Sequence, residues 1–450
     1  MDNKGAEGQA LSSPKKASAS LSTWKAENLT ARARLKGIAN WIAEHELWLL
    51  SVPVTLMLFV GRLPIRIISA SLLLIPIPWV CRRAAKGYLT ARTPMDLSIV
   101  VLLGMALVGL YPSVDSAMSI PVLYKMIVEF ALFYGLVNSF RSERRIWAIV
   151  AVLLLAGTGA SLLGLVGTGE MAYDFSTILG THRDFVLQLV RHLNQAGFND
   201  NIVGGTLAML FPLNLSLFCF GSKRRSRPLL AFSLLLIGTT VLLTQSRGAL
   251  IGLAVALVTM AIWRSRWLVL LVPLALIGLF VVSRYLGVEQ TEIADFFLTT
   301  ETIRSVQARF DLWQRAIYML QDFPFTGIGL GTFSRVASVM YPYFLLGPNA
   351  VVPQAHNVFL QAGVDLGIPG LVAFIALLTT FSITAVDTVR MAKQTEFEPL
   401  AMGLLCGFVV YLVHGLVDAV TFSTKPGTVI WMIIGLMTAL WCRLKSVERD

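Results

Sequence analysis

The sequence predicts an all-α membrane protein, a polytopic bundle of about twelve transmembrane helices. Only 14% of its 450 residues are charged and the mean hydropathy is +0.70, whereas soluble domains carry about 25% charged residues. Apolar runs long enough to cross a bilayer alternate with short charged clusters along the chain. A chain with so little polar surface is not a soluble enzyme, a secreted disulfide scaffold or a DNA-binding protein.

The amino-terminal segment, residues 1–45, differs from the rest of the chain. It is polar and rich in Ser, Ala and Lys, and it holds no apolar core of the signal-peptide type. We expect it to be a disordered, basic, cytoplasmic tail.

Twelve predicted spans follow, nine in residues 46–283 and three in residues 355–442, before a second cytoplasmic tail at 443–450. Their ranges are 46–61, 65–80, 96–112, 119–140, 146–166, 200–220, 228–244, 248–263, 267–283, 355–380, 399–416 and 427–442. A hydrocarbon core of ~30 Å requires about 20 residues. The first two spans are shorter, so they tilt little, borrow flanking residues or form a shallow hairpin around Pro64.

The placement of positive charge predicts the orientation of the bundle. A net charge of +11 and a pI near 9.7 are compatible with a nucleic-acid partner, but the basic residues gather at the ends of apolar runs, as in CRRAAKGYLTAR, RSERR and SKRRSR. Basic residues concentrate in cytoplasmic loops. We therefore expect both termini in the cytoplasm and no nucleic-acid partner.

Two of the predicted outer loops are long. Residues 167–199 contain THRDFVLQLVRHLNQ, whose apolar residues recur at helical spacing. Residues 284–354 form the larger, periplasmic loop and contain IRSVQARFDLWQRAIYMLQDFP, an amphipathic helix predicted to lie on the outer surface of the bundle or membrane. Its apolar stripe consists of Ile303, Val306, Phe310, Trp313, Ile317 and Leu320.

Known disulfide, metal and nucleotide motifs are missing from the sequence. The four cysteines show no CxxC spacing, the histidines are scattered, and the sequence has neither HExxH nor clustered carboxylates. The glycine-rich turn TGIGLGTF follows no predicted strand and precedes no Lys-Ser/Thr pair, so it is not a nucleotide-binding loop. We expect no metal and no cofactor.

Two polar residues stand at predicted membrane boundaries, where a polar group is a candidate for function. Arg247, in LLTQSRGALIG, is held in a tight turn between two spans; its guanidinium suits an anionic headgroup, with interfacial snorkelling as the alternative. His356, in AHNVFLQAGVDLGIPGLVAF, opens the span after the large loop. Its imidazole could take a proton from a substrate hydroxyl near neutral pH, or simply cap the helix.

The predicted loop helix carries three further candidates. Arg309 lies one turn before Trp313, and Arg315 follows. These residues are candidates for binding substrate, although arginines of an amphipathic helix often only solvate its polar face.

Three more polar residues lie near predicted span ends. His414 and Asp418, in HGLVDAVTF, are four residues apart on one helical face, and an acid at that depth requires a partner. Asn201, after FND, is compatible with helix capping or with substrate binding.

Taken in order, TQSRGALIGL, a large outer loop with ARFDLWQRAIYMLQDFPFTGIGLGTF, and AHNVFLQAGVDLGIPGLVAF resemble the O-antigen ligase and polymerase superfamily of bacterial envelope glycosyltransferases. The resemblance covers about residues 200–420. It implies a GT-C-like fold of about twelve helices with a periplasmic cavity, in the bacterial inner membrane. It also implies a donor glycan carried on undecaprenyl pyrophosphate.

The resemblance further implies roles for individual residues. Arg247 and Arg309 would bind the pyrophosphate, and His356 would be the acid/base group. Asp418 corresponds, more loosely, to an acid of the penultimate span. The family is regarded as metal-independent. The other expected substrate-binding residues are Arg315, Asn201, Trp313 and His414.

The acceptor remains open between three classes. A ligase transfers the glycan to lipid A-core, a polymerase to another lipid-linked repeat unit, and a protein O-oligosaccharyltransferase to Ser or Thr. The single large outer loop favours the ligase. A proton-coupled secondary transporter using Lys125 and Glu129 is the rival class, with a non-catalytic binding role third, but the sequence shows no repeated halves of the kind transporters often have.

Overall fold

The computed structural model describes residues 32–57, 59–60, 63–139, 141–167, 200–221, 224–265, 300–343, 352–419 and 427–449. Over these ranges the chain forms helices and no strand, apart from an isolated bridge between Val60 and Leu63. The all-α prediction is therefore confirmed for the described residues.

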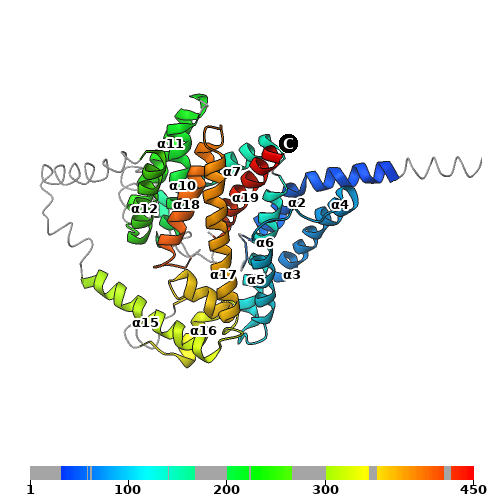
Figure 1. The fold of residues 1–450 in the computed structure, drawn as a ribbon. Coiled ribbons are helices and arrows are strands. Elements are labelled where there is room, and N and C mark those ends of the chain that lie inside the picture. Colours follow the sequence, from blue (N-terminus) through cyan, green and yellow to red (C-terminus); the bar gives the residue numbers. More distant parts are fainter. Residues whose placement is uncertain are drawn as a thin grey trace, which may run out of the picture.

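The helices form a bundle with one group lying across its end (Figure 1). They are α2 (Glu46–Met57), α3 (Ile65–Ala70), η1 (Ser71–Leu74), α4 (Pro76–Lys86), α5 (Asp96–Val108), α6 (Ser116–Val137), α7 (Glu143–Gly167), α10 (Asp200–Phe220), η3 (Arg224–Ser226), α11 (Arg227–Leu243), α12 (Arg247–Arg264), α15 (Thr300–Asp322), α16 (Phe333–Met340), α17 (Val358–Met391), α18 (Glu398–His414) and α19 (Gly427–Arg449).

Seven helical segments of the described chain are long and apolar enough to cross a membrane. They are Ile65–Lys86, Ser116–Val137, Glu143–Leu165, Asp200–Phe220, Arg247–Arg264, Val358–Met391 and Gly427–Ser446. Shorter apolar helices occupy the predicted spans that begin at residues 46, 96, 228 and 399. The predicted span 267–283 lies outside the described residues, as does nearly all of the loop 167–199, so the count of twelve stays a prediction.

The amino-terminal prediction needs a correction, because residues 32–44 are helical rather than disordered. Ala43 is buried, and its carbonyl accepts a hydrogen bond from Arg82 Nη2 at 2.8 Å. Leu35 and Ile38 remain exposed, an arrangement typical of a helix that lies at a membrane interface. The polar composition of the tail hid this short amphipathic segment.

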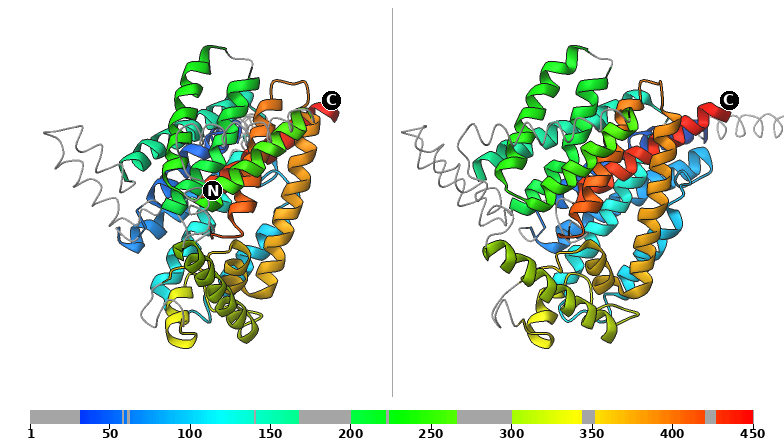
Figure 2. Two further views of the ribbon diagram at one scale, coloured as in Figure 1. Left: turned by 90° about the vertical axis from the view of Figure 1, so that its left-hand side faces the viewer. Right: turned by 60° about the vertical axis from the view of Figure 1, so that its left-hand side comes forward.

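Helix α18 lies at the centre of the bundle, against α10 and α12 (Figure 2). Glycines allow this close approach, as small residues do between membrane helices. A Cβ atom at Gly407 of α18 would lie 2.5 Å from the Met209 carbonyl oxygen of α10, and one at Gly252 of α12 would lie 3.1 Å from the Val410 carbonyl oxygen of α18. The backbones of these three helices therefore hold their ends in a fixed relation.

Helices α15 and α16 lie across one end of the bundle, and α15 packs against α17. Leu312, Ala316 and Met319 form the buried face of α15. The predicted apolar stripe is a different face, because Phe310 is 60% exposed and Ile317 is 44% exposed. An apolar face turned away from the protein fits the prediction that this helix lies on an outer surface.

The glycine-rich turn after α15 docks onto a kink in α17. Gly367 interrupts α17 with φ of 70°, and Gly327 of the turn has φ of 68°. Ile328 N–H donates to the Val364 carbonyl at 2.9 Å, and Gly331 N–H donates to Asp365 Oδ1 at 3.2 Å. Only glycine adopts positive φ at no cost, so this turn shapes the junction between α15 and α17.

Candidate functional site

The start of α17 and the end of α18 are joined by hydrogen bonds at the end of the bundle that carries α15. Val358 N–H donates to the Gly415 carbonyl at 2.8 Å, and Asn357 Nδ2 donates to the Leu416 carbonyl at 3.1 Å. Asn357 also caps α17, because its Oδ1 accepts from two backbone N–H groups of the first turn. These bonds fix the backbone on either side of His356 and Asp418.

His356 and Asp418 form a direct pair. The imidazole Nδ1 lies 3.0 Å from the carboxylate Oδ1. The His356 backbone has φ of 48°, a left-handed conformation that is uncommon for a residue with a side chain, and Trp313 Nε1 donates to its carbonyl at 3.4 Å. The His356 side chain is 22% exposed and that of Asp418 is 3% exposed, so the imidazole is open on one side and anchored on the other.

Asp418 is held as a carboxylate by several donors. Gln354 Nε2 donates to Oδ1 at 3.0 Å, and Ala419 N–H donates to the same oxygen at 2.8 Å. Burial alone raises the pKa of Asp418, but the hydrogen bond and charge of His356, together with His414 and the Ala419 N–H, bring it below its ordinary value. The group is therefore ionised at neutral pH and orients the imidazole.

Arg309 reaches this pair from α15. Its Nε donates to the Val417 carbonyl at 3.0 Å, beside Asp418, and its Nη1 donates to Ser305 Oγ at 2.7 Å. Burial and the nearby charge of Arg247 lower the pKa of Arg309, while the charge of Asp418 raises it. An arginine remains protonated despite such a shift, so the site contains a partly buried positive charge.

Arg247 is the first residue of α12, and its charge acts on Arg309 at the same site. Its neighbour Gly248 allows α12 to meet α18, since a Cβ atom there would lie 2.7 Å from Val417 Cγ2 and 3.1 Å from His414 Cδ2. A Cβ atom at Gly205 of α10 would lie 2.5 Å from His414 Cε1. The buried His414 ring therefore fills the space between α10 and α12, with its Nε2 4.0 Å from Asp418 Oδ2.

The structure thus brings together most of the residues predicted from the sequence. Arg247, Arg309, Trp313, His356, His414 and Asp418 gather at one end of the bundle. Asn201 lies one turn before Gly205 on α10, on the same helical face, and it is partly exposed.

Arg315 lies elsewhere on α15. It forms a buried ion pair with Asp311 at 3.2 Å, and its Nε donates to the Pro342 carbonyl at 3.2 Å. Residues six apart on a helix face different directions, so Arg315 is directed away from Arg309. These contacts favour a role in holding the segment after α16, and its predicted substrate contact remains untested.

Several residues that shape the candidate site were not recognised from the sequence. Gln354 precedes His356 by only two residues, but nothing in the local pattern distinguishes it from an ordinary loop glutamine. Ser305 lies one turn before Arg309, a spacing that could have been noticed. Nothing in the sequence indicated a role for Gly205 and Gly248. Both make room for the ring of His414, which lies far away in the sequence.

The charges of the site suit an anionic ligand. Two guanidinium groups, Arg247 and Arg309, and one carboxylate, Asp418, lie at the site, and guanidinium groups bind phosphate oxygens in a forked geometry. Within the described ranges, no group of three or more His, Cys, Asp or Glu side chains is arranged to hold a metal ion. The arrangement can bind an anion beside an oriented imidazole.

Fold and site together describe a helical protein with membrane-length helices and, at one end of its bundle, two arginines close to a His–Asp pair. Residues 204–375 match the family model described as O-antigen ligase. This match supports the resemblance to the O-antigen ligase and polymerase superfamily. A search of curated proteins finds no match.

The matched region contains most of the candidate site. It begins in α10 and ends in α17, and it includes Arg247, Arg309, Trp313 and His356. His414 and Asp418 lie beyond it and enter the site through the packing of α18. The family suggests a ligase or polymerase activity of the glycosyltransferase type.

Proposed function

We propose that the protein transfers a glycan from undecaprenyl pyrophosphate to an acceptor hydroxyl at the periplasmic face of the bacterial inner membrane. One observation carries this proposal: Arg247 and Arg309 interact electrostatically close to a His356–Asp418 pair, at the end of the bundle where α15 and α16 lie. The family match at residues 204–375 agrees with this class of reaction.

The two arginines bind the pyrophosphate of the donor. In this reaction the bond between the anomeric carbon and the pyrophosphate oxygen breaks, and its electron pair leaves with undecaprenyl pyrophosphate. Positive groups fixed beforehand around the leaving oxygen stabilise the charge that develops there. The leaving group is part of the donor, so the transfer needs no nucleotide.

His356 acts as the base for the acceptor. A carboxylate only accepts hydrogen bonds, so His356 Nδ1 carries the proton shared with Asp418 and Nε2 is free to accept another. The acceptor oxygen attacks the anomeric carbon, its proton passes to Nε2, and the configuration at that carbon inverts. General-base catalysis of this kind contributes about 10² to 10⁴ in rate.

Ligation to lipid A-core is the acceptor reaction that we favour, because the sequence predicts one large outer loop with no second loop of comparable size. Polymerisation of repeat units and protein O-glycosylation are the alternatives within the same chemistry. A proton-coupled transporter is the more distant alternative. Its substrate site would be expected near the middle of the membrane, whereas this cluster lies at the ends of α12, α17 and α18.

Purified protein tests the proposal directly. It is incubated with a lipid-linked oligosaccharide and, separately, with lipid A-core, a second lipid-linked repeat and a Ser/Thr peptide, and product mass is measured. We expect His356→Ala to retain donor binding and to lose about 10² to 10⁴ of the rate, and Arg247→Ala and Arg309→Ala to lose donor binding.

Lys36→Ala, in the helical segment 32–44, is a control with an exposed cation far from the site along the chain. The proposal is wrong if all three acceptors stay unmodified with wild-type protein. It is also wrong if the site variants form product at the wild-type rate.

A further inference from the structure

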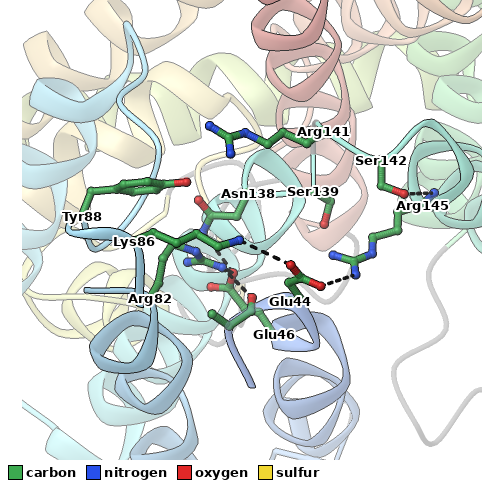
Figure 3. Close-up of a pocket in the computed structure, with 11 residues that line it drawn as sticks. Glu44, Glu46, Arg82, Lys86, Tyr88, Asn138, Ser139, Arg141, Ser142 and Arg145 are labelled. Atoms are coloured by element: carbon green, nitrogen blue, oxygen red, sulfur yellow. Dashed lines mark hydrogen bonds and ion pairs between the residues drawn. The ribbon is translucent and has the colours of Figure 1, made fainter. Parts of the chain in front are cut away.

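A second charged site lies at the opposite end of the bundle. Helix α6 connects the two ends: Ser119, in its first turn, donates through Oγ to the Leu330 carbonyl beside α16, while Asn138 and Ser139 follow its last residue. A helix of 22 residues is about 33 Å long. A pocket of about 250 Å³ opens around Asn138 and Ser139, between the ends of α2, α4, α6 and α7 (Figure 3).

A buried ion pair between Arg82 and Glu46 forms one side of this pocket. Arg82 Nη2 lies 2.6 Å from Glu46 Oε2, and both side chains are almost fully buried. Trp79 and Asn138 also donate to Glu46, and Arg82 donates to the carbonyls of Ala43 and Leu89. With its hydrogen bonds complete within the protein, this pair gives the pocket a rigid wall.

The rim of the pocket has an excess of positive charge. Lys86 and Arg145 both approach one carboxylate, Glu44, at 3.6 Å and 3.7 Å, and Figure 3 shows them reaching it from two sides. Arg141 contributes a third cation, and the Tyr88 hydroxyl provides a neutral donor. Lys86 and Arg145 share the single carboxylate of Glu44, so these three side chains carry one positive charge that an anion can neutralise.

The surroundings point to a ligand that also has an apolar part. Helices α2 and α4, which supply Glu46 and Arg82, expose large apolar side chains close to the pocket in sequence: Trp48 is 77% exposed and Val80 is 61% exposed. Apolar faces at the ends of membrane helices contact acyl chains, and basic pockets between such helices bind anionic lipid headgroups.

We propose that the pocket between α2, α4, α6 and α7 binds the phosphate headgroup of an anionic membrane lipid in the leaflet opposite to the His356 site. Lys86 and Arg145 neutralise the phosphate, and Glu44 competes with it for the same two cations. This site is separate from the glycan-transfer site and does not depend on the proposed function.

Native mass spectrometry of the full chain in detergent tests the proposal with phosphatidylglycerol, phosphatidylethanolamine and inorganic phosphate as probes. We expect one phosphatidylglycerol to be retained in preference to phosphatidylethanolamine. Lys86→Gln and Arg145→Gln should each weaken its binding about fivefold. Glu44→Gln should strengthen it, because the competing carboxylate is removed, and a purely structural cluster would not show this gain.

A similar exposed ion pair provides matched controls. Arg264 and Glu398 lie 3.4 Å apart at the same end of the bundle, so Arg264→Gln and Glu398→Gln lose the same charges outside the pocket. Both should bind phosphatidylglycerol as the wild type does. The proposal fails if the pocket and control variants behave alike, if both lipids bind equally, or if inorganic phosphate alone displaces the lipid.

Discussion

The geometry of the His356–Asp418 pair depends on a few hydrogen bonds, each of which can be tested by substituting one residue. Asp418 Oδ1 receives hydrogen bonds from Gln354 Nε2 and Ala419 N–H and lies 3.0 Å from His356 Nδ1. The left-handed backbone of His356 costs conformational free energy of about 1 to 3 kcal/mol. Two hydrogen bonds offset that cost: one from Trp313 Nε1 to the His356 carbonyl, and one from Asn357 Nδ2 to the Leu416 carbonyl. Together they keep the imidazole in one orientation.

The lowered pKa of Asp418 predicts how stability depends on pH. A carboxylate with a lower pKa in the folded state stabilises the fold above its unfolded-state pKa of about 3.9 and loses that contribution as pH falls through the folded-state pKa. We expect wild type to be more stable than Asp418→Asn at pH 6, with the difference shrinking below about pH 4. Thermal unfolding in detergent at pH 6 and pH 3 measures this, and a pH-independent difference would contradict it.

At the scale of helices, glycines decide how closely α10, α12 and α18 approach. The ring of His414 occupies the space that a side chain at Gly205 would need. Helix packing of this kind is sensitive to a single methyl group, because interiors are close-packed.

Gly205→Ala should therefore move His414 and lower glycan transfer, with a loss of stability of about 1 to 3 kcal/mol. Gly104→Ala is the matched control, since a Cβ atom there meets nothing within 4 Å, and it should be neutral or slightly stabilising. Product formation and thermal unfolding of both variants measure the effect. Equal behaviour of the two variants would show that the contact with His414 has no consequence.

The buried ion pair of α15, between Asp311 and Arg315, leads to a second prediction. Asp311→Asn leaves the buried charge of Arg315 without its carboxylate and should cost about 3 to 5 kcal/mol. The double variant Asp311→Asn with Arg315→Gln buries no charge and should cost less. Chemical denaturation of both variants tests this order of stability.

The same double variant decides the role of Arg315. If its contacts are structural, the folded double variant should bind the lipid-linked donor as tightly as wild type. Donor binding measured on the purified variant checks this. A folded double variant with weakened donor binding would instead support the substrate contact predicted from the sequence.

At the scale of the whole molecule, the two ends of the bundle carry different chemistry. The cluster around His356 lies with α15 and α16 at one end, and the carboxyl end of α19 lies at the other (Figures 1 and 2). The basic segments predicted as cytoplasmic, including those around Arg82 and Arg145, belong to the end of α19, where Arg443 contacts Glu143 at 2.9 Å. The fold is therefore consistent with a site on the outer face.

Cysteine labelling tests this orientation. In a chain whose four cysteines are replaced by serine, Ser338→Cys near the end of α16 should react with a membrane-impermeant maleimide added outside the inner membrane. Ser446→Cys near the end of α19 should react only after permeabilisation. Both positions are exposed, so access depends on the side of the membrane, and the reverse pattern would overturn the predicted topology.

The sequence by itself determined the apolar helices, the order of the motifs and the choice of Arg247, Arg309, His356 and Asp418. It could do so because insertion of a helix into a bilayer depends on its own composition, with all backbone hydrogen bonds satisfied within the segment. Local periodicity also indicated the loop helix, although not which of its faces is buried.

Only the tertiary structure decided which residues meet. His356 and Asp418 are 62 positions apart, and Arg309 and the Val417 carbonyl are 108 apart. Their contact depends on the close packing of α10, α12, α17 and α18, which rests on the fit of individual glycines and side chains. The hydrophobic pattern does not encode that fit. Only the three-dimensional structure therefore shows the His414 ring packed between α10 and α12, the buried ion pair of Arg315 and the pocket around Glu44.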